Sequence, residues 1–240
     1  MASVAEIIFY PAKSGSDPRP SIAEAEAALA TRPGFKNAYL GQVTEDRRIH
    51  CFVLEWREKA DVVAWASDPR AYKIKDSFES VVDLQAGLEP FIVLTTFKHD
   101  ISAAMAANVT EFGFFSLPDK NATEHVVMQK IIGDVDMSQH PVITVGKAKG
   151  AATGHIWMVK PEMAEVDNTT VFTGVFGYDS VDDHWKWRAT REHAEVVKGM
   201  DVFVKELGLR PVDVLGKRRA MFEGSGIIHV EFKKMFSGPA

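Results

Sequence analysis

The chain has 240 residues, of which 46% are hydrophobic and 25% are charged, and its formal net charge is -5. Such a chain can bury a large core without disulfides or a structural metal, and its negative charge argues against nucleic acid or an anionic membrane as a partner. The single cysteine, Cys51, excludes an internal disulfide and a cysteine-rich zinc site and favours a reducing compartment, so we expect a cytoplasmic protein.

The start of the chain, MASVAEIIFYPA, is expected to form a strand. It has no basic stretch before its short apolar run, which a signal peptide would need. No later stretch approaches the roughly 18 consecutive apolar residues of a membrane-spanning helix. We therefore expect no membrane partner.

The first half of the chain predicts the order strand, helix, strand, strand, helix, strand. The first helix is expected to open with a capping box of Ser21 and Glu24 and to end at Pro33-Gly34. The second helical region is expected to start at Asp68-Pro69, because proline is well tolerated in the first helical turn. The predicted strands cover residues 4–11, 35–42, 50–56 and 91–98.

The second half repeats this order, which indicates an internal duplication. VTEFGFFS aligns with VAEIIFYP, which places Glu111 over Glu6 (111 − 6 = 105). A helix capped by Asn121 and Glu124 should follow, and then a strand at 142–146.

Two later alignments extend the repeat. TVFTGVF lies over HCFVLEW with an offset of 120 (170 − 50), which places Trp185 over Trp65, and GIIHVEFK lies over FIVLTTFK with an offset of 135 (226 − 91). A second helical region is expected from near Ala189. The offset grows because we interpret residues near 147–168 and 206–225 as insertions.

Each half therefore reads β-α-β-β-α-β, the ferredoxin-like motif, with an antiparallel sheet that carries its helices on one face. The other face is apolar and needs a cover, for which the matching face of the sister unit is suited. We predict an α+β fold in which two ferredoxin-like repeats, residues 1–100 and 108–237, close into one barrel within the chain. A remaining sheet edge could still pair between chains, so both monomer and homodimer stay open.

Several motifs resemble a known family. They are the PGF turn at Pro33 followed by AYLGQ, the strand end VLEW at Trp56, the helix with Trp65, and WKWRATREHAEVV in the second half. They resemble the antibiotic-biosynthesis-monooxygenase and EthD-like branches of the dimeric α/β-barrel superfamily, and most of all tandem proteins of fungal secondary metabolism. The resemblance implies a pocket between sheets and helices that hosts cofactor-independent oxygenation, cyclisation, dehydration or isomerisation, with haem in some branches.

Strand alternation sorts the ionisable residues by face. In the last strand His229 and Glu231 share one face, while the other carries only apolar residues. We expect the apolar face to pack on the helices, so that His229 and Glu231 point into the barrel. Glu111 and its counterpart Glu6 are further barrel candidates, with a solvent-exposed strand start as the alternative.

A histidine beside a carboxylate is the least that general acid–base catalysis near neutral pH requires. His229 with Glu231 or Glu111 could provide it. His193 lies beside the apolar face of its helix, and the family resemblance favours it as an acid or base. Lys73 stands at the corresponding place in the first half (193 − 120 = 73), so we expect only one half to be catalytic. The alternative is that both histidines are packing residues.

The aromatic residues and the absence of cofactor motifs complete the prediction. There is no nucleotide-binding loop, nucleophile elbow or clustered metal-ligand spacing, so we expect neither metal nor cofactor, with haem as a minor alternative. We predict a cofactor-free cyclase, lyase, isomerase or monooxygenase acting on an aromatic or polyketide-like hydrophobic substrate. The alternatives are a haem-binding barrel enzyme and a non-catalytic ligand-binding or stress-response protein. The predicted substrate-binding residues are Tyr10, Trp56, Tyr72, Glu111 and Phe176.

Overall fold

The first ferredoxin-like unit is complete in the structure. The computed structural model describes residues 3–85, 90–117, 136–160, 170–207, 210–211 and 227–239. The first unit contains β1 (Ser3–Pro11), α1 (Arg19–Leu29), β2 (Phe35–Val43), β3 (Ile49–Trp56), α2 (Lys59–Ala66), α3 (Pro69–Glu79) and β4 (Phe91–Phe97). Its antiparallel strands lie in the order β4-β1-β3-β2, which is the predicted ferredoxin-like arrangement.

The second unit has the same strand order. After the linker helix α4 (Ser102–Met105) it contains β5 (Val109–Leu117), η1 (Met137–Gln139), α6 (Pro141–Thr144), β6 (Gly150–Lys160), β7 (Thr170–Tyr178), α8 (Val181–Arg188), α9 (Arg191–Leu207), β8 (Arg210–Pro211) and β9 (Ile227–Ser237). Its main strands lie in the order β9-β5-β7-β6. The predicted helix with Asn121 and Glu124 lies outside the described residues.

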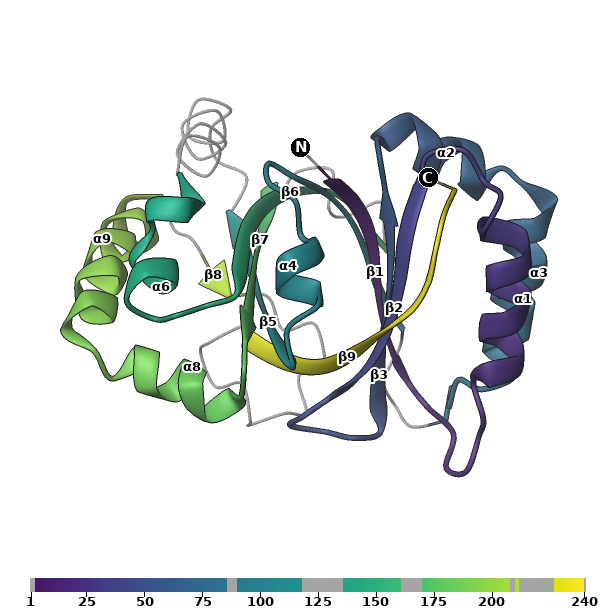
Figure 1. Ribbon diagram of the computed structural model, residues 1–240, viewed down its shortest axis with the longest axis horizontal. Coiled ribbons are helices and arrows are strands. Elements are labelled where there is room, and N and C mark those ends of the chain that lie inside the picture. Colours follow the sequence, from purple (N-terminus) through teal and green to yellow (C-terminus); the bar gives the residue numbers. More distant parts are fainter. Residues whose placement is uncertain are drawn as a thin grey trace.

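Two seams between the units close the barrel. β4 pairs with β6 and β2 pairs with β9, both antiparallel, so eight strands form a ring and β8 extends from β5. The helices of the first unit cover one flank of this ring, and α6, α8 and α9 cover the opposite flank (Figure 1). The prediction of an α+β barrel built from two ferredoxin-like units within one chain is confirmed.

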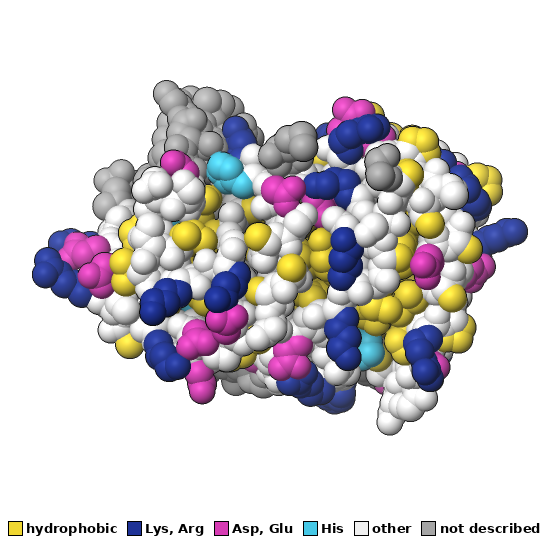
Figure 2. All heavy atoms as spheres, viewed as in Figure 1, with side chains coloured by type: hydrophobic (Ala, Val, Ile, Leu, Met, Phe, Trp, Pro, Cys, Tyr) yellow, Lys and Arg dark blue, Asp and Glu magenta, His cyan; other side chains and the backbone are white. Residues whose placement is uncertain are grey.

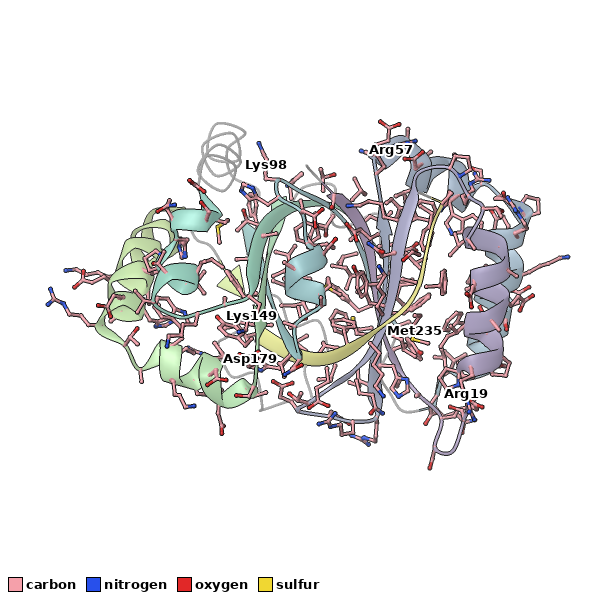
Figure 3. All side chains as sticks on the ribbon, in the orientation of Figure 1. Arg19, Arg57, Lys98, Lys149, Asp179 and Met235 are labelled. Carbon is pink, nitrogen blue, oxygen red and sulfur yellow. The ribbon has the colours of Figure 1, made fainter. Side chains whose placement is uncertain are left out.

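The space inside the ring is a packed apolar core. Every strand of the ring contributes buried side chains to it, and Ala104 and Met105 of α4 add to it together with the preceding Ile101. Figure 3 shows side chains filling the space that the strands enclose. Within the described residues, aromatic and branched side chains therefore fill the interior of the barrel.

The expected orientation of the last strand is also wrong. Ile228, Val230 and Phe232 belong to the core inside the barrel, so His229 and Glu231 point outward, toward the helix side of the sheet. Periodicity identified the two faces correctly but could not tell which one lay inside, because both sides of the sheet meet apolar partners.

The ladders correct the predicted register of the repeat. β1 pairs Val4 with Trp56 and β5 pairs Val109 with Tyr178, so Trp56 corresponds to Tyr178, an offset of 122 (178 − 56). The helices α2 and α8 share it (181 − 59 = 122). Trp65 therefore corresponds to Trp187, and both indoles are 5% exposed, whereas Trp185 is 52% exposed. The predicted offset of 120 was therefore two residues too small, which is one period of side-chain alternation along a strand.

Two local predictions are also corrected. Residues 141–144 form the helix α6 rather than a strand, because Pro141 opens the helix and the His140 ring accepts a hydrogen bond from the Val142 N–H. The strand is β6, within what we interpreted as an insertion. In α1 no side chain caps the helix, and the Ser21 hydroxyl instead donates to the backbone carbonyl of Ser77.

Glycine allows α4 to approach the second sheet closely. A Cβ added at Gly177 in β7 would lie 2.7 Å from the carbonyl oxygen of Ala104. Gly177→Ala is expected to lower the free energy of unfolding by about 1–3 kcal/mol, measured by urea denaturation. Gly199→Ala is the matched control, because a Cβ added at Gly199 would meet nothing within 4 Å outside its own helix backbone, and alanine is favoured in an α-helix. Equal stabilities of the two variants would contradict this packing.

Candidate functional site

The predicted residues Glu111 and His229 lie directly opposite each other on neighbouring strands. β5 and β9 pair them in register, and both side chains face the helices of the second unit. The helix α8 places His184 above them. Ser180 fixes the start of this helix, because its hydroxyl oxygen accepts a hydrogen bond from the Asp183 N–H. His184 and Trp187, one turn apart, form the buried face of α8.

These residues belong to a chain of hydrogen-bonded side chains. Glu45 Oε1 lies 2.5 Å from His229 Nδ1, and His229 Nε2 lies 2.8 Å from His184 Nδ1. His184 Nε2 lies 3.2 Å from Glu111 Oε2, and the Tyr178 hydroxyl donates to the same Glu111 carboxylate. We call these five residues the relay.

Both units build the relay. Glu45 comes from the loop between β2 and β3 of the first unit, and its carboxylate also accepts from the backbone N–H of His229. Two residues further on, Arg47 forms a bidentate ion pair with Glu231 of β9, at 2.6 and 2.9 Å. We call this pair the clamp. It fastens the loop with Glu45 to the strand that carries His229.

The centre of the relay is closed to solvent. His184 and His229 are each 2% exposed and Glu111 is 6% exposed. Burial raises the pKa of Glu111 to about 7, although the positive charges of His229 and Arg188 and the Tyr178 hydrogen bond oppose the shift. Burial also lowers the pKa of His184 to about 3, with the charges of His229 and Arg188 acting in the same direction.

At Glu45, the opposite effects of burial and of His229 on the pKa balance differently. Burial alone would raise the pKa of Glu45, but the hydrogen bond and charge of His229 outweigh it and lower the pKa. Glu45 is therefore an ionised carboxylate that accepts the His229 Nδ1–H. This contact fixes which ring nitrogen of His229 faces His184.

The remaining protons can be distributed in two ways. In the first, His229 is an imidazolium that donates to His184 Nδ1, and His184 Nε2–H donates to an ionised Glu111. In the second, a protonated Glu111 donates to His184 Nε2, and His184 Nδ1–H donates to a neutral His229. Both hold the same number of protons and leave His184 neutral. Shifting two protons along existing hydrogen bonds interconverts them, so the relay can transfer a proton between His229 and Glu111.

In the first unit, apolar residues stand at the positions of the two relay histidines. The offsets of 105, 122 and 135 put Glu6, Val62 and Leu94 at the positions of Glu111, His184 and His229. Val62 and Leu94 are buried in the core of the first unit. Within the described residues, this histidine pair is therefore confined to the second unit.

The chemistry of the donor set argues against a metal at this place. Glu111, His184 and His229 offer ligand atoms within 4.8 Å of one another. Two histidines and a carboxylate are a common ligand set for iron and zinc. However, His184 uses one ring nitrogen toward His229 and the other toward Glu111, so no single nitrogen of its ring faces both partners. The arrangement is that of a continuous chain of hydrogen-bonded side chains. For the same reason neither relay histidine offers a free nitrogen to haem iron.

The other predicted catalytic residues lie outside the relay. His193 on α9 is half-buried, and its ring stands perpendicular to Trp187 at a centroid distance of 5.4 Å. Burial and the charge of Arg188 lower the pKa of His193. Glu231 is half-exposed in the clamp with Arg47, so its expected place inside the barrel is wrong.

The predicted substrate-binding residues are scattered. Tyr10 and Trp56 are buried in the helix-side core of the first unit, and Tyr72 is 60% exposed on α3. Phe176 packs near the relay, because it pairs with Glu111 in the β5–β7 ladder and contacts the apolar cluster around Tyr178 and Trp187. Only Glu111 belongs to the relay, with Phe176 beside it.

Sequence analysis missed three relay residues. His184 was hidden by the register error, which paired it with the exposed Ala64 (184 − 120 = 64), and Tyr178 lay beyond the aligned strand. Glu45 is 184 residues away from His229, and no local pattern could have linked them. A register fixed by the helix starts, Lys59 and Val181, would have placed His184 over Val62 (184 − 122 = 62), on the buried face of the helix.

A groove of about 680 Å³ runs beside the clamp, and both apolar residues and polar residues, among them Gln42, Glu231 and Lys233, line it. Asp179 also lines it and forms an ion pair with Lys149 at 2.8 Å (Figure 3). Acidic and basic side chains are interspersed over the face in Figure 2, without one large basic surface of the kind that nucleic acid binds. None of the described helices combines the length and the apolar character needed to cross a bilayer.

The sequence matches no protein-family profile, and no curated protein matches it. Solved structures do match over nearly the whole chain. An anthrone oxidase-like protein has a TM-score of 0.57 at 11% identity, over 98% of this chain and 92% of its own. A candidate monooxygenase from Lactobacillus acidophilus NCFM has a TM-score of 0.53 at 10% identity, over 99% and 98%.

A candidate chlorite dismutase matches with a TM-score of 0.52 at 9% identity, over 97% of this chain and 96% of its own. At these identities the likeness concerns the fold. The chain has the dimeric α/β-barrel fold, in which one polypeptide supplies both halves, and the resemblance noted in the sequence is confirmed at that level.

The raised pKa of Glu111 predicts a pH effect on stability. The folded state favours the protonated carboxyl, so the stabilisation is complete below pH 4.5 and is lost as the pH rises toward about 7. The wild type should therefore lose roughly 3 kcal/mol relative to Glu111→Gln over this interval. Urea denaturation at several pH values measures this difference, and a constant difference would contradict the buried position of the carboxyl.

Proposed function

We propose that the protein is a cofactor-free enzyme that performs acid–base chemistry on an aromatic or polyketide-like small molecule. The observation that carries the proposal is the buried relay, with a carboxyl group whose pKa is about 7 at its inner end. Acids and bases act best when their pKa lies near the working pH. A structural ion pair would not need a neutral histidine between two ionisable partners.

The surroundings of Glu111 favour a flat, apolar substrate. Phe176 pairs with Glu111 in the sheet, and Met137, Tyr178 and Trp187 form an apolar cluster on the same side. Aromatic side chains of this kind suit conjugated rings and exclude water, which strengthens the electrostatic effect of the carboxylate. The substrate is therefore expected at the Glu111 end of the relay.

The reaction begins with ionised Glu111 taking a proton from an acidic C–H or phenolic O–H of the substrate. The electron pair left behind is delocalised into the conjugated carbonyl system of the substrate. The relay then passes a proton from imidazolium His229 toward Glu45, which leaves His229 neutral and Glu111 protonated. Return of a proton at another atom completes an isomerisation, or assists loss of water or ring closure.

The names of two structural neighbours favour oxygenation as one outcome of the same first step. One is anthrone oxidase-like and the other is a candidate monooxygenase. A deprotonated, electron-rich substrate can pass electrons to molecular oxygen, which would then be the oxidant. Proton removal by Glu111 would precede that electron transfer.

The test is incubation of the protein with a panel of anthrones and linear polyketones, in D₂O, under air and under nitrogen. NMR follows deuterium uptake at the acidic carbons, and mass spectrometry follows products. We expect accelerated exchange in both atmospheres, with any oxygenated product formed only under air. Binding of panel members without exchange or product would favour a non-catalytic binding protein. A Soret band after addition of haemin would favour the haem-binding alternative.

A further inference from the structure

We propose that Glu45, supplied by the first unit, is the port through which the relay exchanges protons with solvent. The inference rests on the proposed function and adds a proton-transfer residue to it. A reaction that takes a proton from a substrate needs a place to deliver it. The relay has two ends, Tyr178 and Glu45, and they differ in exposure.

Glu45 has the greatest solvent contact in the relay. Its side chain is 21% exposed, compared with 2% for each histidine side chain and 8% for Glu111. At the other end Tyr178 is 1% exposed, and burial followed by the charge of Glu111 raises the pKa of its hydroxyl. A proton therefore leaves most readily through the carboxylate of Glu45.

Hydrogen bonds hold the Glu45 carboxylate in position for this transfer. The backbone N–H of His229 lies 3.2 Å from each of its oxygens, and the Thr44 hydroxyl donates to Oε2 at 3.0 Å. Among the contacts of Glu45 with described residues, that of Oε1 with His229 Nδ1 links the carboxylate to the next ring of the relay. This geometry orients Oε1 toward the ring and leaves carboxylate lone pairs for water.

The strands on either side of the loop with Glu45 line the groove, through Gln42 of β2 and His50 of β3, and water there can accept the proton. Gln42 and Glu231 both line the groove, and Gln42 Nε2 donates to the carbonyl oxygen of Arg47 at 3.3 Å. The clamp between Arg47 and Glu231 joins the same loop to β9. The port therefore lies at the seam between the units, close to the groove.

The surroundings of His184 disfavour a second proton on its ring. Burial lowers the pKa of His184, and the positive charges of His229, Arg188 and His193 lower it further. His184 is therefore a neutral link, and the proton leaves the relay from the His229 nitrogen that faces Glu45. In the exit step His229 Nδ1–H breaks as Glu45 gains an O–H, and Glu45 then passes that proton to a water molecule or a buffer base.

Proton exchange of the imidazole N–H groups with water tests the port without any substrate. Protein with ¹⁵N-labelled histidine is studied by NMR, and saturation transfer from water gives the exchange rates of the hydrogen-bonded His184 and His229 protons. We expect Glu45→Gln to slow exchange by about tenfold or more, because the amide is a far weaker base. Added imidazole buffer should restore part of the rate in this variant and have little effect on the wild type.

Two further variants separate proton transfer from structure. Glu45→Asp keeps a carboxylate and should retain most of the exchange rate, and Glu231→Gln weakens the clamp and should give an intermediate rate. If Glu45→Gln exchanges as fast as the wild type, or if added imidazole restores nothing, Glu45 is not the port. If Glu45→Asp slows the exchange as much as Glu45→Gln does, the role of Glu45 is purely structural. That result would also overturn the proposal.

The port and the proposed function can fail separately. Absence of a hydrogen-bonded proton between His184 and His229 in the wild type would contradict the relay itself, and the proposed function with it. Normal relay signals, with exchange unchanged by Glu45→Gln, would exclude the port alone. In that case the acid–base proposal would stand, and the proton would have to leave by another route.

Discussion

Replacing His184 with glutamine is expected to lower turnover by about 10²–10⁴-fold, the usual contribution of a positioned acid or base. His184 is the link between His229 and Glu111 in the relay, with contacts of 2.8 and 3.2 Å. Glutamine can hydrogen-bond to one neighbour, but it cannot accept a proton at one atom and release it from another. The measurement is the rate of deuterium uptake or product formation with the best substrate of the panel.

The matched control is His193→Gln. His193 is also a histidine of the second unit beside Trp187, but within the described residues its ring contacts that indole and no relay atom. We expect at most a small change in turnover. Equal losses in the two variants would mean that the relay has no special role and would favour the original prediction of a catalytic His193.

A double variant tests whether the relay acts as one unit. If His184 and Glu111 carry the same proton, the combined variant His184→Gln with Glu111→Gln should lose little more activity than the worse single variant. Losses that multiply would show two independent contributions. Thermal unfolding of each variant shows whether lost activity reflects lost structure.

The duplication, and with it the fold, could be predicted from the sequence. Repeated strand patterns such as VAEIIFYP and VTEFGFFS identify two similar units, and an apolar sheet face requires a cover. Which face of the last strand lies inside the barrel could not be predicted, because Ile228 and Val230 would be equally well buried against helices or inside a barrel. Only closure of the ring by β4–β6 and β2–β9 decides it.

Only the part of the site that lies on paired strands could be predicted from the sequence. Glu111 and His229 occupy strands whose pairing follows from the ferredoxin-like order, so their proximity is a consequence of the topology. Glu45 reaches His229 through a loop that crosses from one unit to the other. The length of that loop and the clamp at Arg47 fix the contact, and neither leaves a periodic signal in the sequence.

The two units differ at the place of the relay. In the first unit Val62 and Leu94 pack where the second unit has His184 and His229. The first unit instead carries a buried carboxylate at the opposite face of its sheet, Glu55, which is fully buried near one end of the barrel. Its counterpart in the second unit is Gly177 (55 + 122), against which α4 packs.

Glu55→Ala is expected to lower the free energy of unfolding by about 3–5 kcal/mol, because it removes one partner of a buried ion pair. The carboxylate of Glu55 pairs with Lys36 and accepts hydrogen bonds from Ser3 at 2.8 Å and Asn37 at 2.7 Å. Ser102 of α4 reaches the same carboxylate at 3.5 Å. The substitution leaves these donors unsatisfied around a small cavity. Equilibrium urea unfolding of both proteins measures the loss.

Glu231→Ala is the control for this prediction, because it also removes a carboxylate from an ion pair. Its partner Arg47 and Glu231 itself are about half exposed, at 53% and 46%, so solvent screens their attraction and the expected loss is below about 1 kcal/mol. A loss from Glu55→Ala as small as this would show that water reaches the end of the barrel. A large loss would show that the Glu55 cluster stabilises the barrel.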